Sequence, residues 1–149
     1  MRAVVQRVTE AAVSVDGRII GAIGRGLVVL LGISPRDGER ETAWLVDKVK
    51  NLRIFGDDQG KMNLSLLDAG GAVLLVSQFT LYGDARRGRR PSFVGAAQGP
   101  EAEELYSRIV RAFAQSDVRC ETGEFGAVME VRLTNEGPVT ILLDSEKLF

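Results

Sequence analysis

Two stretches of this sequence are apolar at nearly every position, and they constrain the possible folds more than any other feature. The first is LVVLLGI at residues 27–33, and the second begins at Gly71 and continues as GAVLLVSQFTL. A strand with one solvent-facing side alternates apolar and polar residues, whereas an unbroken apolar run indicates a strand that is buried on both faces. The chain must therefore supply other elements that cover these two strands.

The remaining segments predict two helices and several more strands. Residues 39–52 and 101–114 each carry an apolar stripe at helical spacing. Residues 2–23 alternate around Asp16-Gly17, which is a strong hairpin signal, and residues 118–143 return to a strand pattern. Because strands outnumber helices and most connections look like hairpins, we expect the α+β class. The expected architecture is a mainly antiparallel sheet, curled or closed into a barrel, with two main helices packed outside.

Length and composition favour one domain over residues 1–149, and the net charge of the chain is near zero. The 149 residues are 45% hydrophobic and 26% charged, and their net charge is −1. No overall basic field would therefore attract a nucleic acid. The single dense basic patch is RRGRR, Arg86 to Arg90, which suits either a solvated loop or a local contact with a polyanion.

No apolar run reaches the length of a signal peptide core or a membrane span, so we expect a cytoplasmic protein with no membrane contact.

The absence of histidine limits the possible chemistry most strongly. Histidine is the usual general base near neutral pH and a frequent metal ligand, so Ser-His and Cys-His dyads are excluded. A zinc site would depend on one cysteine and carboxylates, so we expect no metal and no cofactor. The one cysteine, Cys120, cannot form an internal disulfide and is interpreted as structural or incidental.

Two short stretches invite a functional interpretation. Ser77 to Thr80 follow the second buried strand, and polar groups at such a strand exit either cap a neighbouring backbone or bind a ligand. Thr80 has no neighbouring base in the sequence that would make it a nucleophile. Gly137-Pro138 interrupts an otherwise β-like segment, and residue types alone favour a hairpin turn there.

Several segments together resemble one known family. They are, in chain order, MRAVVQRV, GLVVLLGI, KMNL, VSQFTL, RPSF and NEGPVT. In this order they resemble the bacterial D-aminoacyl-tRNA deacylase family over nearly the whole chain, up to about Leu143. SQFTL and the N-x-GPVT pattern are the two signature motifs of that family. The tail, residues 144–149, lies outside the resemblance and is assigned no role.

The resemblance implies an activity and a set of site residues. The family hydrolyses the ester that joins a D-amino acid, or glycine, to the terminal adenosine of tRNA. It releases free tRNA and rejects L-aminoacyl-tRNA. Carried over, the pocket for the adenosine and the scissile ester is lined by Ser77, Gln78, Phe79 and Thr80. Gly137 and Pro138 become the chirality filter, a cis peptide whose two carbonyls project into the pocket of the partner subunit in a homodimer.

The resemblance also accounts for the missing histidine. An aminoacyl ester is already activated, and the 2′-hydroxyl of the RNA is understood to assist the attack of water. The protein would then supply orientation and main-chain N–H groups around Gln78 to Thr80 as an oxyanion pocket. Two alternatives stay open at this point: a non-catalytic module that binds the tRNA 3′ end, and a Thr80-dependent esterase. The sequence also leaves open the amino acids accepted, the tRNA preference, and whether Arg86 to Arg90 contact the acceptor stem.

Overall fold

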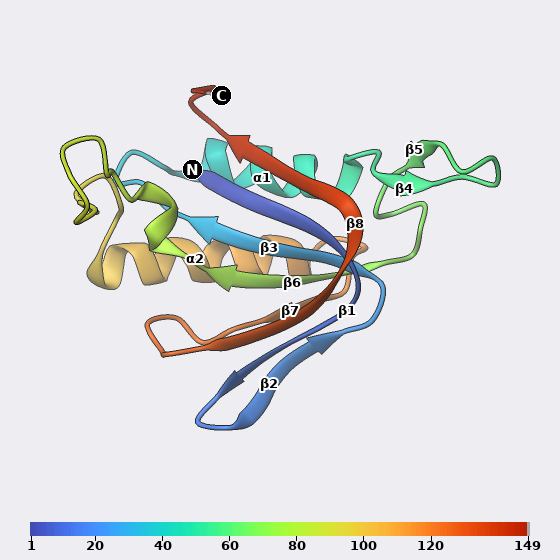
Figure 1. Cartoon of the computed structure of the whole chain (residues 1–149), viewed down its shortest axis with the longest axis horizontal. Coiled ribbons are helices and arrows are strands. Elements are labelled where there is room, and N and C mark those ends of the chain that lie inside the picture. Colours follow the sequence, from blue (N-terminus) through green and yellow to red (C-terminus); the bar gives the residue numbers. More distant parts are fainter. Residues whose placement is uncertain (149) are drawn as a thin grey trace.

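The computed structural model describes residues 1–148, and Phe149 lies outside the described residues. Six strands form one sheet in the order β2-β1-β3-β6-β7, and β8 pairs with β1 in addition (Figure 1). These strands are β1 (Arg2–Val15), β2 (Arg18–Ile23), β3 (Gly26–Gly32), β6 (Ala72–Ser77), β7 (Cys120–Thr122) and β8 (Glu130–Asp144). The other elements are α1 (Glu39–Asn51), α2 (Gly99–Ala114), the 3₁₀ turn η1 (Phe79–Tyr82) and a small hairpin of β4 (Phe55–Gly56) and β5 (Met62–Leu64). The α+β prediction is confirmed.

The two apolar runs are the neighbouring central strands β3 and β6, which pair in parallel. Strand β7 also runs parallel to β6, while β1 is antiparallel to β2, β3 and β8. The sheet is therefore mainly antiparallel, as expected, but contains two parallel pairs that the sequence pattern did not predict. Each helix explains one of them, because α1 connects β3 to β6, α2 connects β6 to β7, and parallel neighbours require a long crossover.

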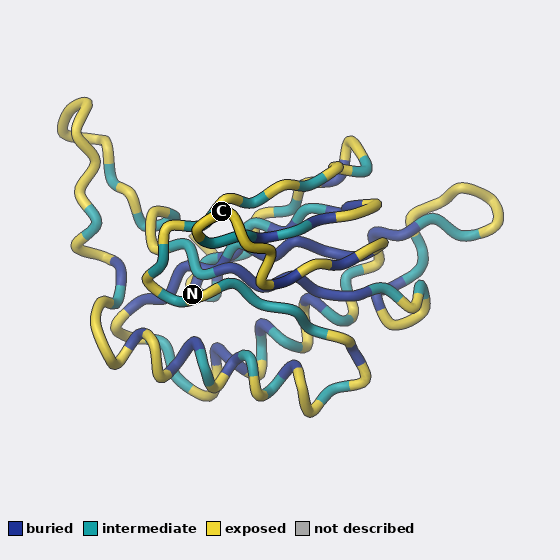
Figure 2. The backbone as a smooth tube through the Cα atoms, turned by 90° about the horizontal axis from the view of Figure 1, so that it is seen from below, coloured by how far each residue is buried: buried dark blue, intermediate teal, exposed yellow. Residues whose placement is uncertain are grey.

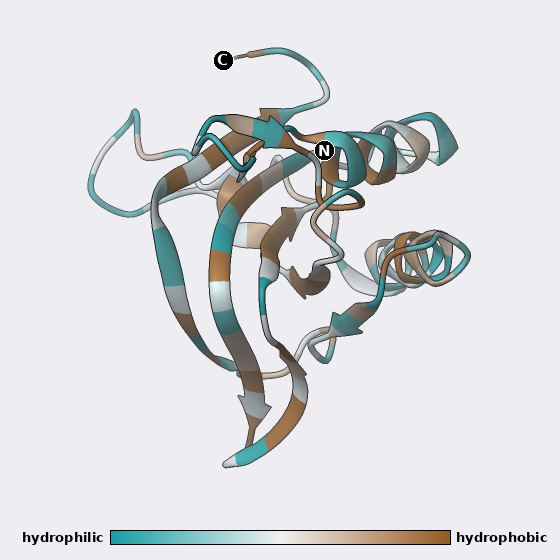
Figure 3. Ribbon diagram, turned by 90° about the vertical axis from the view of Figure 1, so that its right-hand side faces the viewer, coloured by the Kyte–Doolittle hydropathy of each residue, from teal (hydrophilic) through white to brown (hydrophobic). Residues whose placement is uncertain are grey.

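Both helices lie on one side of a strongly curved sheet (Figure 3). The larger core fills the space between them and includes Leu45, Ile109 and Phe113 from the helices, all fully buried. A second core, which includes Val8, Val28 and Leu74, lines the other face of the sheet. The central strands are thus covered on both faces, which is why their sequences are apolar throughout.

The sheet curls until its two edges almost meet. At Gly21 in β2, an added Cβ atom would lie 2.7 Å from the carbonyl oxygen of Thr122 in β7, so only glycine permits this approach. The predicted hairpin between β1 and β2 is confirmed at Asp16 and Gly17, whose φ angles of 49° and 73° suit a type I′ turn. The curled-sheet prediction is therefore confirmed.

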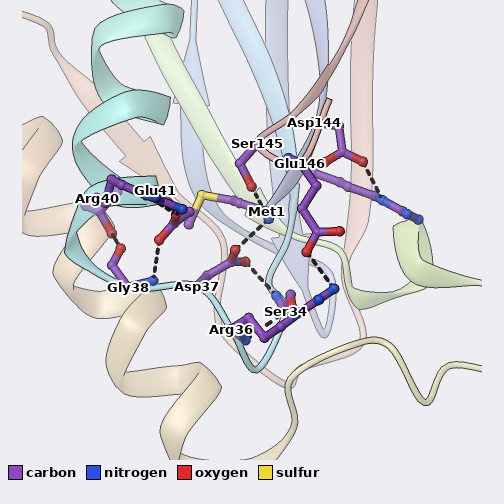
Figure 4. A network of polar contacts seen from close by, with 12 residues as sticks. Met1, Ser34, Arg36, Asp37, Gly38, Arg40, Glu41, Asp144, Ser145 and Glu146 are labelled. Carbon is purple, nitrogen blue, oxygen red and sulfur yellow. Dashed lines mark hydrogen bonds and ion pairs between the residues drawn. The ribbon is translucent and has the colours of Figure 1, made fainter. Parts of the chain in front are cut away.

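Polar contacts join the two ends of the chain to the loop before α1 (Figure 4). The α-ammonium group of Met1 lies 2.6 Å from Asp37 Oδ1 and donates a second hydrogen bond, of 2.7 Å, to Ser145 Oγ. Nearby, Arg36 forms a 2.6 Å ion pair with Glu146. Ser145 and Glu146 in the tail are therefore tied to the rest of the domain, whereas Lys147 and Leu148 are exposed. Within residues 1–148, neither helix is long and apolar enough to cross a membrane.

Candidate active site

A cavity of about 540 Å³ opens where β6 ends and η1 begins. Its walls come from three parts of the chain: the ends of β3 and β6, the start of α2, and the segment from β7 into β8. The lining residues are Leu31, Ile33, Val76, Ser77, Gln78, Phe79, Ala97, Gln98, Gly99, Ala102, Phe125, Gly126, Ala127, Met129 and Val131. Most of them are apolar, and the polar groups lie at the strand exit and at the helix start. This is the usual composition of a small-molecule site.

The SQFTL segment, which begins at Ser77, reaches the cavity because β6 ends there. The N–H group of Gln78 donates a 2.7 Å hydrogen bond to the carbonyl oxygen of Leu31, which ends the parallel ladder with β3. The chain then turns into η1, whose first N–H groups, those of Phe79 and Thr80, have no acceptor within the turn. Of the main-chain donors expected around Gln78 to Thr80, the one on Gln78 is therefore already occupied.

The structure separates Thr80 from the other three signature residues. Ser77, Gln78 and Phe79 line the cavity, whereas Thr80 is exposed and is not among the lining residues. The Thr80 hydroxyl oxygen accepts a hydrogen bond from Nε2 of Gln78. Its side chain thus positions an amide at the mouth of the cavity.

The rest of the lining was not anticipated from the sequence. Gln98, Gly99 and Ala102 come from the first turn of α2, where the positive end of the helix dipole and its unpaired N–H groups face this part of the molecule. The apolar stripe predicted a helix over residues 101–114 but gave no indication of what lies beside its start. Phe125 and Met129 come from residues 123–129, which the sequence pattern predicted as part of a strand region but which form an irregular connection between β7 and β8.

The cavity offers no acid–base chemistry from its own walls. Among the described residues that line it, none has a titratable side chain. The nearby groups Tyr106 and Cys120 lie outside the lining. Burial raises the pKa of the Tyr106 hydroxyl, which donates to the Leu75 carbonyl oxygen, above its ordinary value. Burial, helped by Glu121, raises the pKa of the Cys120 thiol to about 12.

No metal site accompanies the cavity. Within residues 1–148, no cluster of three or more His, Cys, Asp or Glu side chains could hold a metal ion.

Gly137 and Pro138 lie away from this cavity, on an exposed bulge of β8. On either side of the bulge, Gln6 pairs with Thr140 and Val8 pairs with Asn135, so residues 136–139 oppose a single residue of β1. The Gly137-Pro138 peptide is cis, and both residues are exposed. The strand continues through the pair, so the hairpin turn favoured by residue types is wrong. A bulge is one of the few places where a strand tolerates a proline.

Two side chains hold the base of the bulge. The Asn135 side-chain amide donates to the carbonyl oxygens of Arg7, at 2.8 Å, and Val139, at 3.1 Å. The mostly buried guanidinium group of Arg7 lies 3.1 Å from Glu136 Oε2, and it donates a hydrogen bond to the Ile54 carbonyl oxygen. The bulge is therefore anchored at both ends while its tip projects outward.

The comparisons with known proteins decide the family. The family model described as D-Tyr-tRNA(Tyr) deacylase matches residues 4–144. The chain belongs to the D-Tyr-tRNA(Tyr) deacylase family. Similar curated proteins are the D-aminoacyl-tRNA deacylases of Clostridium botulinum, Koribacter versatilis and Kosmotoga olearia, which are 58%, 59% and 60% identical to it over 149 residues. Each of these matches covers 100% of both chains, so the similarity includes the tail.

Solved structures share the fold of this deacylase-family chain. One, described as c-Myc DNA unwinding element binding protein, has a TM-score of 0.91 and 44% identity, with 97% of this chain and 99% of that chain covered. Another, described as a probable eukaryotic D-amino acid tRNA deacylase, has a TM-score of 0.75, with 95% and 97% covered. At 20% identity, the second likeness shows the fold alone.

Proposed function

We infer that this chain is a D-aminoacyl-tRNA deacylase. It hydrolyses the ester between a D-amino acid, or glycine, and the terminal adenosine of tRNA, and it leaves L-aminoacyl-tRNA intact. Family membership over residues 4–144 and relatives of that name support the activity. The observation that carries the site is the cavity at the end of β6, where Ser77, Gln78 and Phe79 form part of the wall. Its volume of about 540 Å³ suits a nucleoside carrying a small ester.

The chemistry follows from what the cavity lacks. Because the described lining residues include no titratable side chain, no protein group there can act as general base. An aminoacyl ester carries its own assistance, since the neighbouring 2′-hydroxyl of the ribose can direct the attack of water. The protein contributes by holding the ester in a fixed orientation and by excluding competing geometries.

When water attacks the ester, negative charge develops on its carbonyl oxygen, and hydrogen-bond donors are needed to stabilise that charge. The N–H group of Phe79 suits this role, because Phe79 lines the cavity and begins η1 without an acceptor within the turn. The next N–H group, on Thr80, is equally free of an acceptor within the turn, although the Thr80 side chain lies outside the lining. The start of α2 adds a favourable dipole on the same cavity. We assign the oxyanion pocket to these main-chain groups, and the adenosine to the apolar walls.

The Thr80-dependent esterase is less well supported. The Thr80 hydroxyl already accepts a hydrogen bond from Gln78 and does not line the cavity. Among the described residues, the side-chain hydrogen-bond partner of this hydroxyl is the Gln78 amide, which is not a base. A nucleophilic threonine needs such a base.

We assign chirality selection to Gly137 and Pro138 acting across a homodimer. Their bulge is exposed and lies away from the cavity of its own chain, so the two features can meet only between two copies. The outer edge of β8, a strand of 15 residues, is also unpaired within the described chain. A long exposed edge of this kind favours pairing with another chain. Main-chain carbonyls at the tip of the bulge would exclude an L side chain while leaving room for a D side chain or for glycine.

The decisive experiment incubates the purified chain with one tRNA charged with the D-amino acid, the L-amino acid or glycine. We expect multiple-turnover loss of the D- and glycyl esters and a stable L-ester. A protein that binds all three without turnover would be a tRNA-end binding module instead. Aminoacyl-tRNA is a cytoplasmic substrate, so we place the enzyme in the cytoplasm.

A further inference from the structure

A basic loop, residues 85–91, leaves the fold beside the cavity. Its neck is closed by two main-chain hydrogen bonds between Asp84 and Ser92, of 2.8 and 2.9 Å. Directly after the neck, the ring of Phe93 packs edge-on against the ring of Phe79, with centroids 5.2 Å apart. Since Phe79 lines the cavity, the base of the loop is fixed to the cavity wall. Figures 1 and 2 show this segment projecting beyond the end of the sheet.

The loop concentrates positive charge on a chain whose net charge is only −1. It carries four arginines, Arg86, Arg87, Arg89 and Arg90, and all four are exposed. Asp84 is the sole carboxylate in residues 69–100, and it pairs with Arg86 at 2.6 Å. This pairing holds the pKa of the Asp84 carboxyl well below its usual range.

Three arginines therefore keep their charge available to another molecule. Within residues 1–148, no ion pair involves Arg87, Arg89 or Arg90. The loop gathers them at one end of the molecule, beyond the end of the sheet, and its base adjoins the cavity wall through the contact between Phe93 and Phe79 (Figure 1). Guanidinium groups bind phosphate oxygens through paired hydrogen bonds and are weakly hydrated, so they suit a polyanion better than solvent alone.

We propose that Arg87, Arg89 and Arg90 bind the phosphate backbone of the acceptor stem of the tRNA whose 3′ end occupies the cavity. The proposal rests on the proposed function, because that function places the tRNA terminus beside Phe79. An RNA helix hides its bases in a deep, narrow groove and presents phosphates outward, so an exposed arginine loop can contact it without reading sequence. The loop thereby adds affinity for any tRNA, whereas the cavity examines the amino acid.

The test compares two variants with the same change in charge. In the first, Arg87, Arg89 and Arg90 are all replaced by alanine, while Arg86 stays to hold Asp84. In the control, Lys48, Lys50 and Lys61 are all replaced by alanine. Lys48 and Lys50 lie on the last turn of α1 and Lys61 lies on the β4–β5 turn, at the opposite end of the molecule (Figure 1). Each protein is titrated with uncharged tRNA over a range of salt concentrations. Each is also assayed on D-aminoacyl-tRNA and on the D-aminoacyl ester of a short CCA oligonucleotide that lacks the stem.

Each phosphate contact that is lost reduces the slope of log affinity against log salt by about one. We expect the arginine variant to lose about 2–3 units of slope and about 10- to 100-fold in tRNA affinity at low salt. Its kcat/KM should fall for full tRNA but stay within about two-fold of wild type for the short ester, because that substrate has no stem to contact. The lysine control should resemble wild type. Lysines at the three loop positions should restore most of the slope, since counterion release depends on charge.

Either of two results overturns the proposal: an arginine variant with the wild-type salt slope, or one that loses activity equally on the short ester. The binding titration separates this inference from the proposed function. If wild type hydrolyses neither ester but its tRNA binding still depends on the three arginines, the deacylase assignment falls and the loop assignment stands. If wild type hydrolyses both esters and the arginine variant matches it in tRNA binding, salt slope and activity, the deacylase assignment stands and the loop assignment falls.

Discussion

The side-chain amide of Asn135 donates a hydrogen bond to the carbonyl oxygen of Val139, four residues further along, at 3.1 Å. This contact spans the exposed bulge that contains Gly137 and Pro138, and a second bond from the same amide ties the bulge to Arg7 in β1. One asparagine side chain therefore fixes the base of the segment that we assign to chirality selection.

Replacing Asn135 by alanine should loosen this bulge. The change leaves two carbonyl oxygens without their donor, so we expect the free energy of unfolding to fall by about 1–2 kcal/mol. Deacylation of D-aminoacyl-tRNA should fall, or its discrimination against the L-ester should weaken. The measurements are urea unfolding and single-turnover rates on both esters. The exposed neighbour Thr134 provides a control, whose alanine variant should stay within about 0.5 kcal/mol of wild type. An Asn135→Ala enzyme with unchanged rate and selectivity would remove the positioning role.

Gly137→Ala should spare the fold and impair function. An added Cβ atom at Gly137 meets no atom within 4 Å in its own chain, so the unfolding free energy should change by less than about 1 kcal/mol. If the bulge meets the substrate in a partner's cavity, the extra methyl group should lower kcat/KM on D-aminoacyl-tRNA at least about ten-fold. Gly24→Ala is the matched control, because its Cβ atom is equally unobstructed. Equal activity of the two variants would argue against contact between Gly137 and the substrate.

Mixed dimers can test whether the bulge acts across subunits. One parent carries Gly137→Ala, and the other carries Ala127→Phe, which fills the cavity wall. A mixed dimer then contains one site in which both the cavity and the bulge are wild type. Co-expression should restore about a quarter of wild-type activity, because about half of the dimers are mixed and each has one intact site. Two inactive parents that stay inactive when mixed, or a protein that sediments as a fully active monomer, would contradict the arrangement.

Thr80→Val should retain deacylation within about ten-fold of wild type, because the oxyanion donors that we assign belong to the main chain. The variant keeps the shape of the side chain and removes the hydroxyl that accepts a hydrogen bond from Gln78. A substrate that ends in 2′-deoxyadenosine should react far more slowly with either protein. The measurement is the deacylation rate of wild type and Thr80→Val on D-aminoacyl-tRNA that ends in adenosine or in 2′-deoxyadenosine. An inactive Thr80→Val variant, together with normal hydrolysis of the deoxy substrate, would establish threonine as the nucleophile.

Cys120 should resist alkylation in the folded protein. Burial raises its pKa from 9.0 to about 12, so at pH 8 the thiol stays protonated and its thiolate fraction is about 1,000-fold lower than in the unfolded chain. Iodoacetamide labelling at pH 8, followed by mass spectrometry, should be slow without urea and rapid in urea. The native rate should rise only as the pH approaches 12. Equal rates with and without urea would show that the thiol is not protected.

The sequence predicted those parts of the fold that depend on local patterns. The apolar runs identified β3 and β6, and Asp16-Gly17 identified the hairpin, because burial and turn geometry are recorded in neighbouring residues. The parallel pairing of these strands was not predictable in the same way. It depends on α1 crossing over the sheet, which is a property of the whole chain.

The site was predictable only in part, for a similar reason. Ser77, Gln78 and Phe79 line the cavity, but family resemblance, rather than their residue types, singled them out. Phe125 and Met129 complete the wall from an irregular segment, and only tertiary packing brings them there. The N–H group of Gln78 is hydrogen-bonded to the Leu31 carbonyl oxygen and is therefore not available to a ligand. This pairing was also not predictable, since the partner of a strand-end N–H group cannot be recognised from one strand alone.

The apolar, uncharged lining of the cavity has a practical consequence for inhibition. Reagents that inactivate many hydrolases work by modifying a carboxylate, an imidazole or an amine at the active centre, and the described lining residues present none of these. Carbodiimides and diethylpyrocarbonate would find no catalytic target in this cavity. A compound that blocks it would have to compete for shape and for main-chain hydrogen bonds, as a stable mimic of the aminoacylated adenosine would do.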